Sequence, residues 1–161
     1  MRYLATVAIL TLVLVSSLVA VPTAQAGAPT SGSGTFDLVS SVITGVRTVG
    51  PNTILNTTDT LTLTGSFSGT LVCDAVTGIS STGESVFRET CTLTGNVNGH
   101  AGTAILALTG TGAADGSFHG QIAVLSGTGD LADLRSRGTF EGVSTPTSAT
   151  GTYSVQIQFA P

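Results

Sequence analysis

The chain contains no lysine, and its only strong cations are arginines, so that five basic residues stand against nine acidic ones. Charged residues make up 9% of the sequence, and no run of basic residues occurs. Nucleic acids and anionic lipid surfaces are bound through clusters of lysine and arginine, so the composition argues against both as partners. No segment of useful length has the 3.6-residue period of a helix, and no strict repeat indicates a solenoid.

One long hydrophobic run is present, at the start of the chain. A basic start at residues 1–3 precedes an apolar run at 4–21, relieved only by Thr and Ser, and the small-residue site Ala-Gln-Ala follows at 24–26. Signal peptidase reads this order, so we expect a secretory signal peptide over residues 1–26 and a secreted protein with no membrane association after cleavage. The alternative is an uncleaved membrane anchor, because the run approaches the roughly 20 residues that span a bilayer.

Residues 27–161 have the length of one domain, and their apolar residues recur with period two. The clearest case runs from Thr60 to Cys73, where odd positions are apolar or Gly and even positions are nearly all hydroxylic. Such alternation predicts strands with one buried and one wet face. Further strands are expected at 34–43, 84–95, 103–110, 116–126, 137–143 and 152–159, with a weak one near 53–57.

About eight antiparallel strands in one small domain must close on themselves or protect their edges. The sequence therefore favours an all-β fold, either an eight-stranded up-and-down barrel or a two-sheet sandwich. An outer-membrane barrel is excluded, because the outward face consists of Thr and Ser and lacks an apolar band with aromatic girdles.

The two cysteines are predicted to form a disulfide, as two cysteines in an exported chain usually do. A hairpin turn over Ser80–Glu84, centred on Thr82, places Cys73 directly opposite Cys91. The same register sets Leu71 against Leu93, Ala75 against Glu89 and Thr77 against Phe87. Closing this loop stabilises a fold by roughly 3 kcal/mol in the chain-entropy model. The alternative is a free, nucleophilic Cys91.

Glu89 is the candidate catalytic residue, because the predicted register puts it on the same face as Phe87 and Cys91. Burial of a carboxyl group among apolar side chains raises its pKa and makes general acid or base chemistry available. The alternative is a solvated Glu89 near the barrel mouth, bonded to a hydroxyl group. The expected ligand-binding side chains in the interior are Phe67, Leu71, Phe87, Glu89, Leu93 and Tyr153.

A second informative stretch covers residues 124–142, with a strand, a Gly-rich turn, one short helical turn and a return strand. Asp130 is placed to start the helical turn, and Leu131 and Leu134 are spaced to tuck under the domain as a plug. The turn itself consists of Gly127, Thr128 and Gly129. It is too short for a phosphate cradle and lacks the lysine that would follow.

Neither a cofactor nor a metal is predicted. His100 and His119 lie in a turn and at a strand start, and no third ligand occurs at a useful spacing.

Several stretches resemble one known family. The loop "LSGTGDLADLRSRG" (125–138), the hairpin "LTGNVNGHAGTAIL" (93–106), the opening "GSGTFDL" (32–38) and the strand "GSFSGTLVCD" (65–74) are similar to segments of the allene oxide cyclase barrel-like proteins. The first also resembles a turn of plant dirigent proteins. The resemblance implies an eight-stranded, calycin-like antiparallel barrel without implying cyclase activity. Trimers among such barrels make a homo-oligomer an expectation to test.

Three functions stay open at this stage. The first is an exported barrel that binds a small apolar molecule in its interior, since eight strands leave room for one small ligand. The second is an enzyme of the cyclase or stereochemistry-guiding type, with Glu89 in an apolar pocket. The third is a filled barrel with a structural or cell-envelope role.

Overall fold

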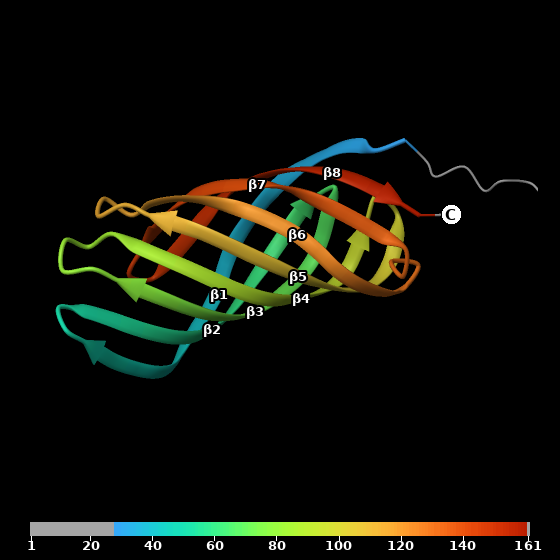
Figure 1. Cartoon of the computed structure of the whole chain (residues 1–161). Helices are drawn as coiled ribbons and strands as arrows, with labels where there is room; N and C mark the ends of the chain where they lie inside the picture. Colours follow the sequence, from blue (N-terminus) through green and yellow to red (C-terminus); the bar gives the residue numbers. More distant parts are fainter. Residues whose placement is uncertain (1–27, 161) are drawn as a thin grey trace, which may run out of the picture.

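The computed structural model describes residues 28–160, in which eight antiparallel strands follow one another in chain order and close into a barrel (Figure 1). The strands are β1 (Thr30–Val49), β2 (Asn52–Gly65), β3 (Phe67–Ile79), β4 (Ser85–Val97), β5 (His100–Gly112), β6 (Ser117–Gly129), β7 (Leu134–Thr145) and β8 (Ser148–Phe159). The predicted all-β barrel is confirmed, and the sandwich alternative is excluded. The predicted signal peptide lies outside the described residues, which include no helix able to span a bilayer.

The clearest alternation of the sequence is two strands joined by a tight hairpin. Ser66 alone connects β2 to β3, and Gly65 adopts φ 100° there, a conformation that suits glycine. Leu63 lies opposite Gly69, and Leu61 opposite Leu71, so odd-numbered positions face inward on both strands. The expected weak strand at 53–57 is the first part of β2.

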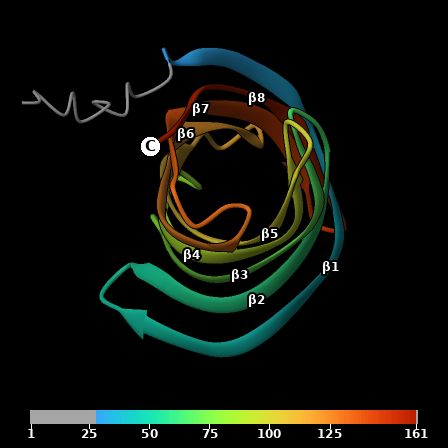
Figure 2. The same cartoon turned by 90° about the vertical axis from the view of Figure 1, so that its right-hand side faces the viewer.

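The two ends of the barrel differ. At one end, here called the mouth, lie the connections at residues 50–51, 80–84, 113–116 and 146–147. At the other, here called the closed end, lie both ends of the described chain and the connections at Ser66, residues 98–99 and residues 130–133. Figure 2 looks at the closed end and shows the orange β6–β7 connection folded across the opening.

The β6–β7 connection plugs the closed end. Leu131 is fully buried and Leu134 is 4% exposed, so both leucines point into the core as their spacing predicted. The same core cluster includes the buried Phe67, Leu93, Val97, Ala104, Leu106, Val155 and Ile157. The expected helical turn takes the form of consecutive hydrogen-bonded turns, in which the amides of Leu131 and Ala132 donate to the carbonyls of Thr128 and Gly129.

A glycine makes this plug sterically feasible. β6 pairs with β7 only over residues 117–123, which frees the chain beyond to turn inward. A Cβ atom on Gly127 would lie 1.9 Å from the carbonyl oxygen of Leu131, so any side chain there would push the plug out. The Gly-Thr-Gly turn therefore has a packing role.

The β3–β4 hairpin has the predicted register. Cys73 faces Cys91, and Leu71, Ala75 and Thr77 face the partners expected for them. The two cysteines form a disulfide with an S–S distance of 2.05 Å, and both are fully buried. Cys91 is therefore not a free nucleophile in this structure.

Candidate functional site

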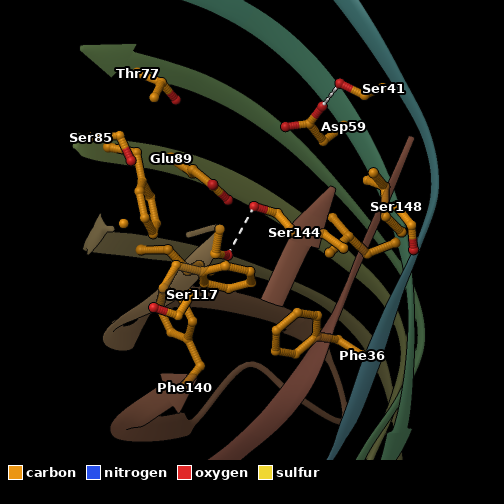
Figure 3. Close-up of a pocket in the computed structure, with 18 of the residues that line it drawn as sticks. Phe36, Ser41, Asp59, Thr77, Ser85, Glu89, Ser117, Phe140, Ser144 and Ser148 are labelled. Atoms are coloured by element: carbon orange, nitrogen blue, oxygen red, sulfur yellow. Dashed lines mark hydrogen bonds between the residues drawn. The ribbon is translucent and has the colours of Figure 1, made fainter. Parts of the chain in front are cut away.

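A cavity of about 320 Å³ occupies the mouth half of the barrel (Figure 3). Leucine and phenylalanine side chains form most of its wall, and hydroxyl groups surround its rim. The apolar lining comprises Phe36, Leu38, Leu61, Leu63, Leu71, Phe87, Leu108, Phe118, Ile122 and Phe140, and the hydroxyl groups of Thr77, Ser85, Ser117, Ser144 and Ser148 lie nearer the opening. An apolar pocket with few polar groups is the usual form of a small-molecule site.

Four of the six residues expected to bind a ligand line this cavity: Leu71, Phe87, Glu89 and Tyr153. Phe67 and Leu93 do not line it. Both are almost completely buried in the packing above the closed end, because Phe67 begins β3 beside the closed-end connection at Ser66 and Leu93 lies toward the closed end of β4. The interior is thus filled at one end and hollow at the other.

Four phenylalanines from four strands surround the cavity, with neighbouring ring centroids 6.0–6.4 Å apart. Each ring covers a glycine directly opposite on the adjacent strand. The pairs are Phe36 with Gly151, Phe87 with Gly110, Phe118 with Gly142 and Phe140 with Gly120. A Cβ on any of these glycines would approach the ring to 2.4–2.8 Å. The glycines therefore provide space for the rings.

Of these four rings, only Phe87 is among the ligand-binding residues predicted from the sequence. Phe36, Phe118 and Phe140 were missed because their meeting around one space depends on how several strands pair in the barrel, which local alternation does not give. The available signal was the recurrence of glycine on strands that also carry phenylalanine, which is typical of aromatic rings packed over cross-strand glycines.

Tyr153 forms part of the cavity floor through its ring, while its hydroxyl group is engaged in the core. The hydroxyl oxygen accepts a hydrogen bond from the amide of Phe67 at 2.8 Å, and its proton points to the carbonyl oxygen of Thr64 or Phe67, each 2.9 Å away. Burial raises the pKa of Tyr153. The hydroxyl therefore fixes the β2–β3 turn and stays protonated.

Two carboxylates supply the charge of the cavity. Burial, with a smaller contribution from the negative charge of Asp59, raises the pKa of Glu89 from 4.5 to about 7. Asp59 accepts hydrogen bonds from the hydroxyls of Ser41 and, at 2.9 Å, of Thr57. No Arg, Lys or His is found among the described residues that line the cavity.

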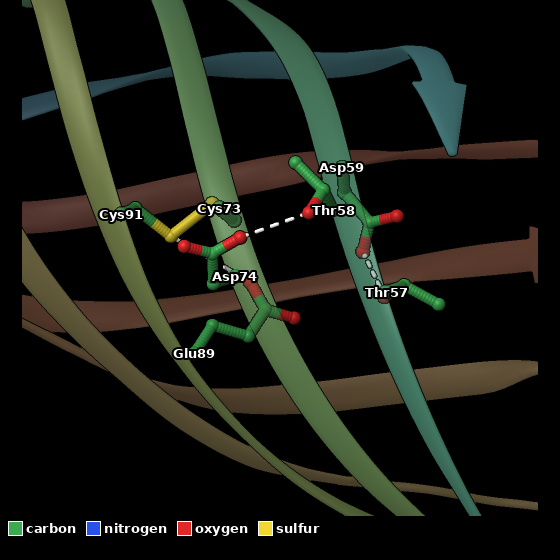
Figure 4. Close-up of a disulfide and its surroundings, with 7 residues drawn as sticks. All are labelled: Thr57, Thr58, Asp59, Cys73, Asp74, Glu89 and Cys91. Atoms are coloured by element: carbon green, nitrogen blue, oxygen red, sulfur yellow. Dashed lines mark hydrogen bonds between the residues drawn. A yellow bond between two sulfur atoms is a disulfide. The ribbon is translucent and has the colours of Figure 1, made fainter. Parts of the chain in front are cut away.

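Glu89 lacks comparable donors within residues 28–160. Its closest polar contact is 3.7 Å, between Oε2 and Sγ of Cys91, and a disulfide sulfur carries no hydrogen to donate (Figure 4). The carboxyl group is partly buried and aimed into the cavity without a protein partner. The Glu89 carboxylate therefore has acceptor capacity left for a bound molecule.

In the described part of the chain, the two histidines considered as metal ligands, His100 and His119, do not form a metal site. Glu89 lies within 4.8 Å of both cysteine sulfurs, but these are bonded to each other and are not thiolate ligands. His100 stacks on Phe159 at 4.2 Å at the closed end. His119 lies on the exposed outer face at the mouth end of β6, so the two histidines do not meet.

The fold and cavity define a class: a closed up-and-down β-barrel with a plugged end and an apolar, acidic pocket at its mouth. The chain belongs to the family described as "Protein of unknown function (DUF3224)", which matches residues 31–157. A crystal structure of a DUF3224 family protein of unknown function from Shewanella oneidensis MR-1 is similar, with a TM-score of 0.66 and 18% identity over 83% of this chain and 100% of that one. That likeness shows the fold alone. None of the curated proteins matches.

The family match corrects the resemblance to allene oxide cyclase barrel-like proteins, which was wrong. The motifs that suggested it consist mainly of glycines and turn residues. Their positions here are explained by backbone packing, as Gly127 against Leu131 illustrates. Such motifs follow from antiparallel barrel geometry and carry no information about a reaction.

Proposed function

We propose that this protein binds a small, mainly apolar molecule in the cavity at the barrel mouth. The observation that supports this most directly is the cavity itself, whose phenylalanine and leucine walls enclose about 320 Å³. Eight-stranded barrels have interiors of the size that holds one small ligand. A purely structural barrel gains stability by filling such a space, since each cavity in a core lowers stability.

The contrast between a filled closed end and a hollow mouth favours a ligand-binding site over a packing defect in the core. The barrel is stabilised away from its mouth, by the plug, the disulfide and the hydrogen bonds of the Tyr153 hydroxyl group. These features form a rigid frame that holds the hollow half open. Apolar walls with convergent carboxyl groups and a hydroxylic rim are the arrangement expected of a ligand site.

Binding is tested with a neutral apolar fluorescent probe, N-phenyl-1-naphthylamine, titrated into the purified protein. The variant Leu61→Trp adds a large ring to the cavity wall and is expected to reduce probe binding at least tenfold. The matched control Val72→Trp adds the same ring to the exposed outer face of the adjacent strand and should bind as the wild type does. Absence of probe uptake by the wild type would refute the proposal.

Export is part of the same proposal. It is supported by the N-terminal pattern of the sequence and by the buried disulfide, since disulfides persist mainly in oxidising compartments. Intact mass spectrometry of protein collected from the culture medium should give a chain beginning after Ala26 and two hydrogens lighter than after reduction. A full-length, reduced chain retained in the cell would refute export.

Proton transfer to or from the bound molecule is a second candidate, favoured by the pKa of Glu89 near 7. A carboxyl group with this pKa exchanges protons efficiently near neutral pH. Native mass spectrometry would identify a retained ligand, which is then incubated with the protein in D₂O. Protein-dependent deuterium incorporation at carbon, abolished by Glu89→Gln, would support an enzyme, whereas exchange equal in both proteins would exclude this role.

A further inference from the structure

We propose that the cavity selects an organic cation: a molecule with an apolar body and a protonated amine, seated between Glu89 and Asp59. This inference rests on the proposed binding function and adds the chemical class of the ligand.

The charge of the wall is of one sign. Glu89 and Asp59 are the charged side chains among the described lining residues, and no basic group opposes them. Two carboxylates facing one space repel each other, and a bound cation relieves that repulsion. An anionic ligand would meet the same two charges without a counter-charge, so the cavity discriminates against fatty acids and other carboxylates.

The two carboxylates are placed to act on one group. Asp59 on β2 pairs with Cys73 on β3, and Glu89 on β4 pairs with Ala75, so the carboxylates flank β3 on its inward face. Figure 4 shows Glu89 and Asp59 on either side of this strand. Between them β3 presents only the methyl group of Ala75 and a sulfur of the disulfide. An ammonium group fits above these small side chains, within reach of both carboxylates.

The rest of the wall suits the remainder of such a ligand. Phe87 rises from the same strand as Glu89, and Phe118 and Phe140 pack against it at 6.3 Å or less. Aromatic faces attract cations through their quadrupole and contact hydrocarbon equally well. The cavity thus offers an apolar base and an anionic side.

Cation binding requires ionised Glu89, so affinity depends on pH. The neighbouring strands present Ala75 and Leu108 to Glu89, and the titratable groups of the same cavity are Asp59 and Tyr153. With its pKa at about 7, Glu89 takes up a proton as pH falls, and affinity for an ammonium ligand should fall by up to about tenfold per pH unit below 7.

The test is isothermal titration calorimetry with three ligands of one shape: 4-phenylbutylamine, 4-phenylbutanol and 4-phenylbutyrate. At pH 8 we expect the amine to bind at least tenfold more tightly than the alcohol, and the carboxylate most weakly. Glu89→Gln and Asp59→Asn should each reduce this preference. Glu141→Gln removes the same charge from the exposed outer face of β7 and should leave the preference unchanged.

The outcomes separate the two proposals. Equal binding of amine and alcohol, or an amine preference that survives in the Glu89→Gln/Asp59→Asn double variant, would overturn the selection of cations and leave apolar binding intact. If neither the three ligands nor the neutral naphthylamine probe binds, the ligand-binding function fails as well. Far-UV circular dichroism verifies that each variant is folded.

Discussion

Replacing Glu89 with glutamine should make the barrel more stable at alkaline pH and change its stability little in acid. The carboxyl group is held among apolar side chains, with Asp59 nearby and no donor in the described structure to compensate its charge. Ionisation of Glu89 is therefore unfavourable in the folded protein. Glutamine has nearly the same shape and is neutral at every pH, so it removes this penalty.

The magnitude follows from the two pKa values, 4.5 for an ordinary glutamate and about 7 for Glu89 in the fold. Below pH 4.5 both folded and unfolded chains carry the proton, and Glu89 imposes no penalty. Between these values the unfolded chain ionises first, so the free energy of unfolding falls as pH rises, and it levels off above pH 7. The accumulated loss is about 3 kcal/mol.

The assay is urea denaturation followed by far-UV circular dichroism between pH 4 and 8.5, in wild type, Glu89→Gln and the surface control Glu141→Gln. At each pH, the wild-type free energy of unfolding is subtracted from that of Glu89→Gln, which separates the contribution of Glu89 from that of the other carboxylates. We expect a difference near zero at pH 4 that grows to about 3 kcal/mol at pH 8. Parallel pH profiles in the wild type and Glu89→Gln would show that the carboxyl group is solvated and would refute the reasoning.

Three further changes test the frame around the cavity, each by urea denaturation. Tyr153→Phe leaves the buried amide of Phe67 without its acceptor and should cost about 1–3 kcal/mol; an unchanged midpoint would show that water replaces the hydroxyl. Gly127→Ala should cost about 1–3 kcal/mol by pressing on Leu131, whereas Gly45→Ala, where an added Cβ meets only the side chain of Asn56 at 3.0 Å, should stay within about 0.5 kcal/mol; equal effects would contradict the steric argument. Reduction of the disulfide should cost about 3 kcal/mol, and no change on reduction would contradict the chain-entropy account.

Sequence patterns were sufficient to predict the strands and the register of one strand pair, β3 with β4. The β3–β4 pairing could be derived because its turn is short and its two cysteines provide an independent check on alignment. Period-two alternation identified inward positions on β2, β3, β4 and β8 by local reasoning alone. The alternation continues across the connection at Ser66. Because this connection is one residue long, odd-numbered positions face inward on both β2 and β3.

The cavity could not be predicted in the same way, because its location depends on how far each strand is staggered around the barrel. Phe67 and Phe87 have the same alternation in the sequence, yet the former is packed at the closed end and the latter borders open space. Asp59 also faces inward, but its position beside Glu89 across β3 becomes visible only when two registers are combined. Local alternation cannot predict which residues meet when their positions depend on several strand pairings.

The separation of mouth from closed end has a consequence for how such proteins diverge. Insertions or deletions in the four hairpins at the mouth alter neither the plug nor the disulfide, because those lie on other connections and on β3 and β4. Surface hairpins tolerate changes in length well. The same frame can therefore acquire a deeper, narrower or differently charged entrance by small insertions, and the shape of the mouth need not be the same in all members of the family.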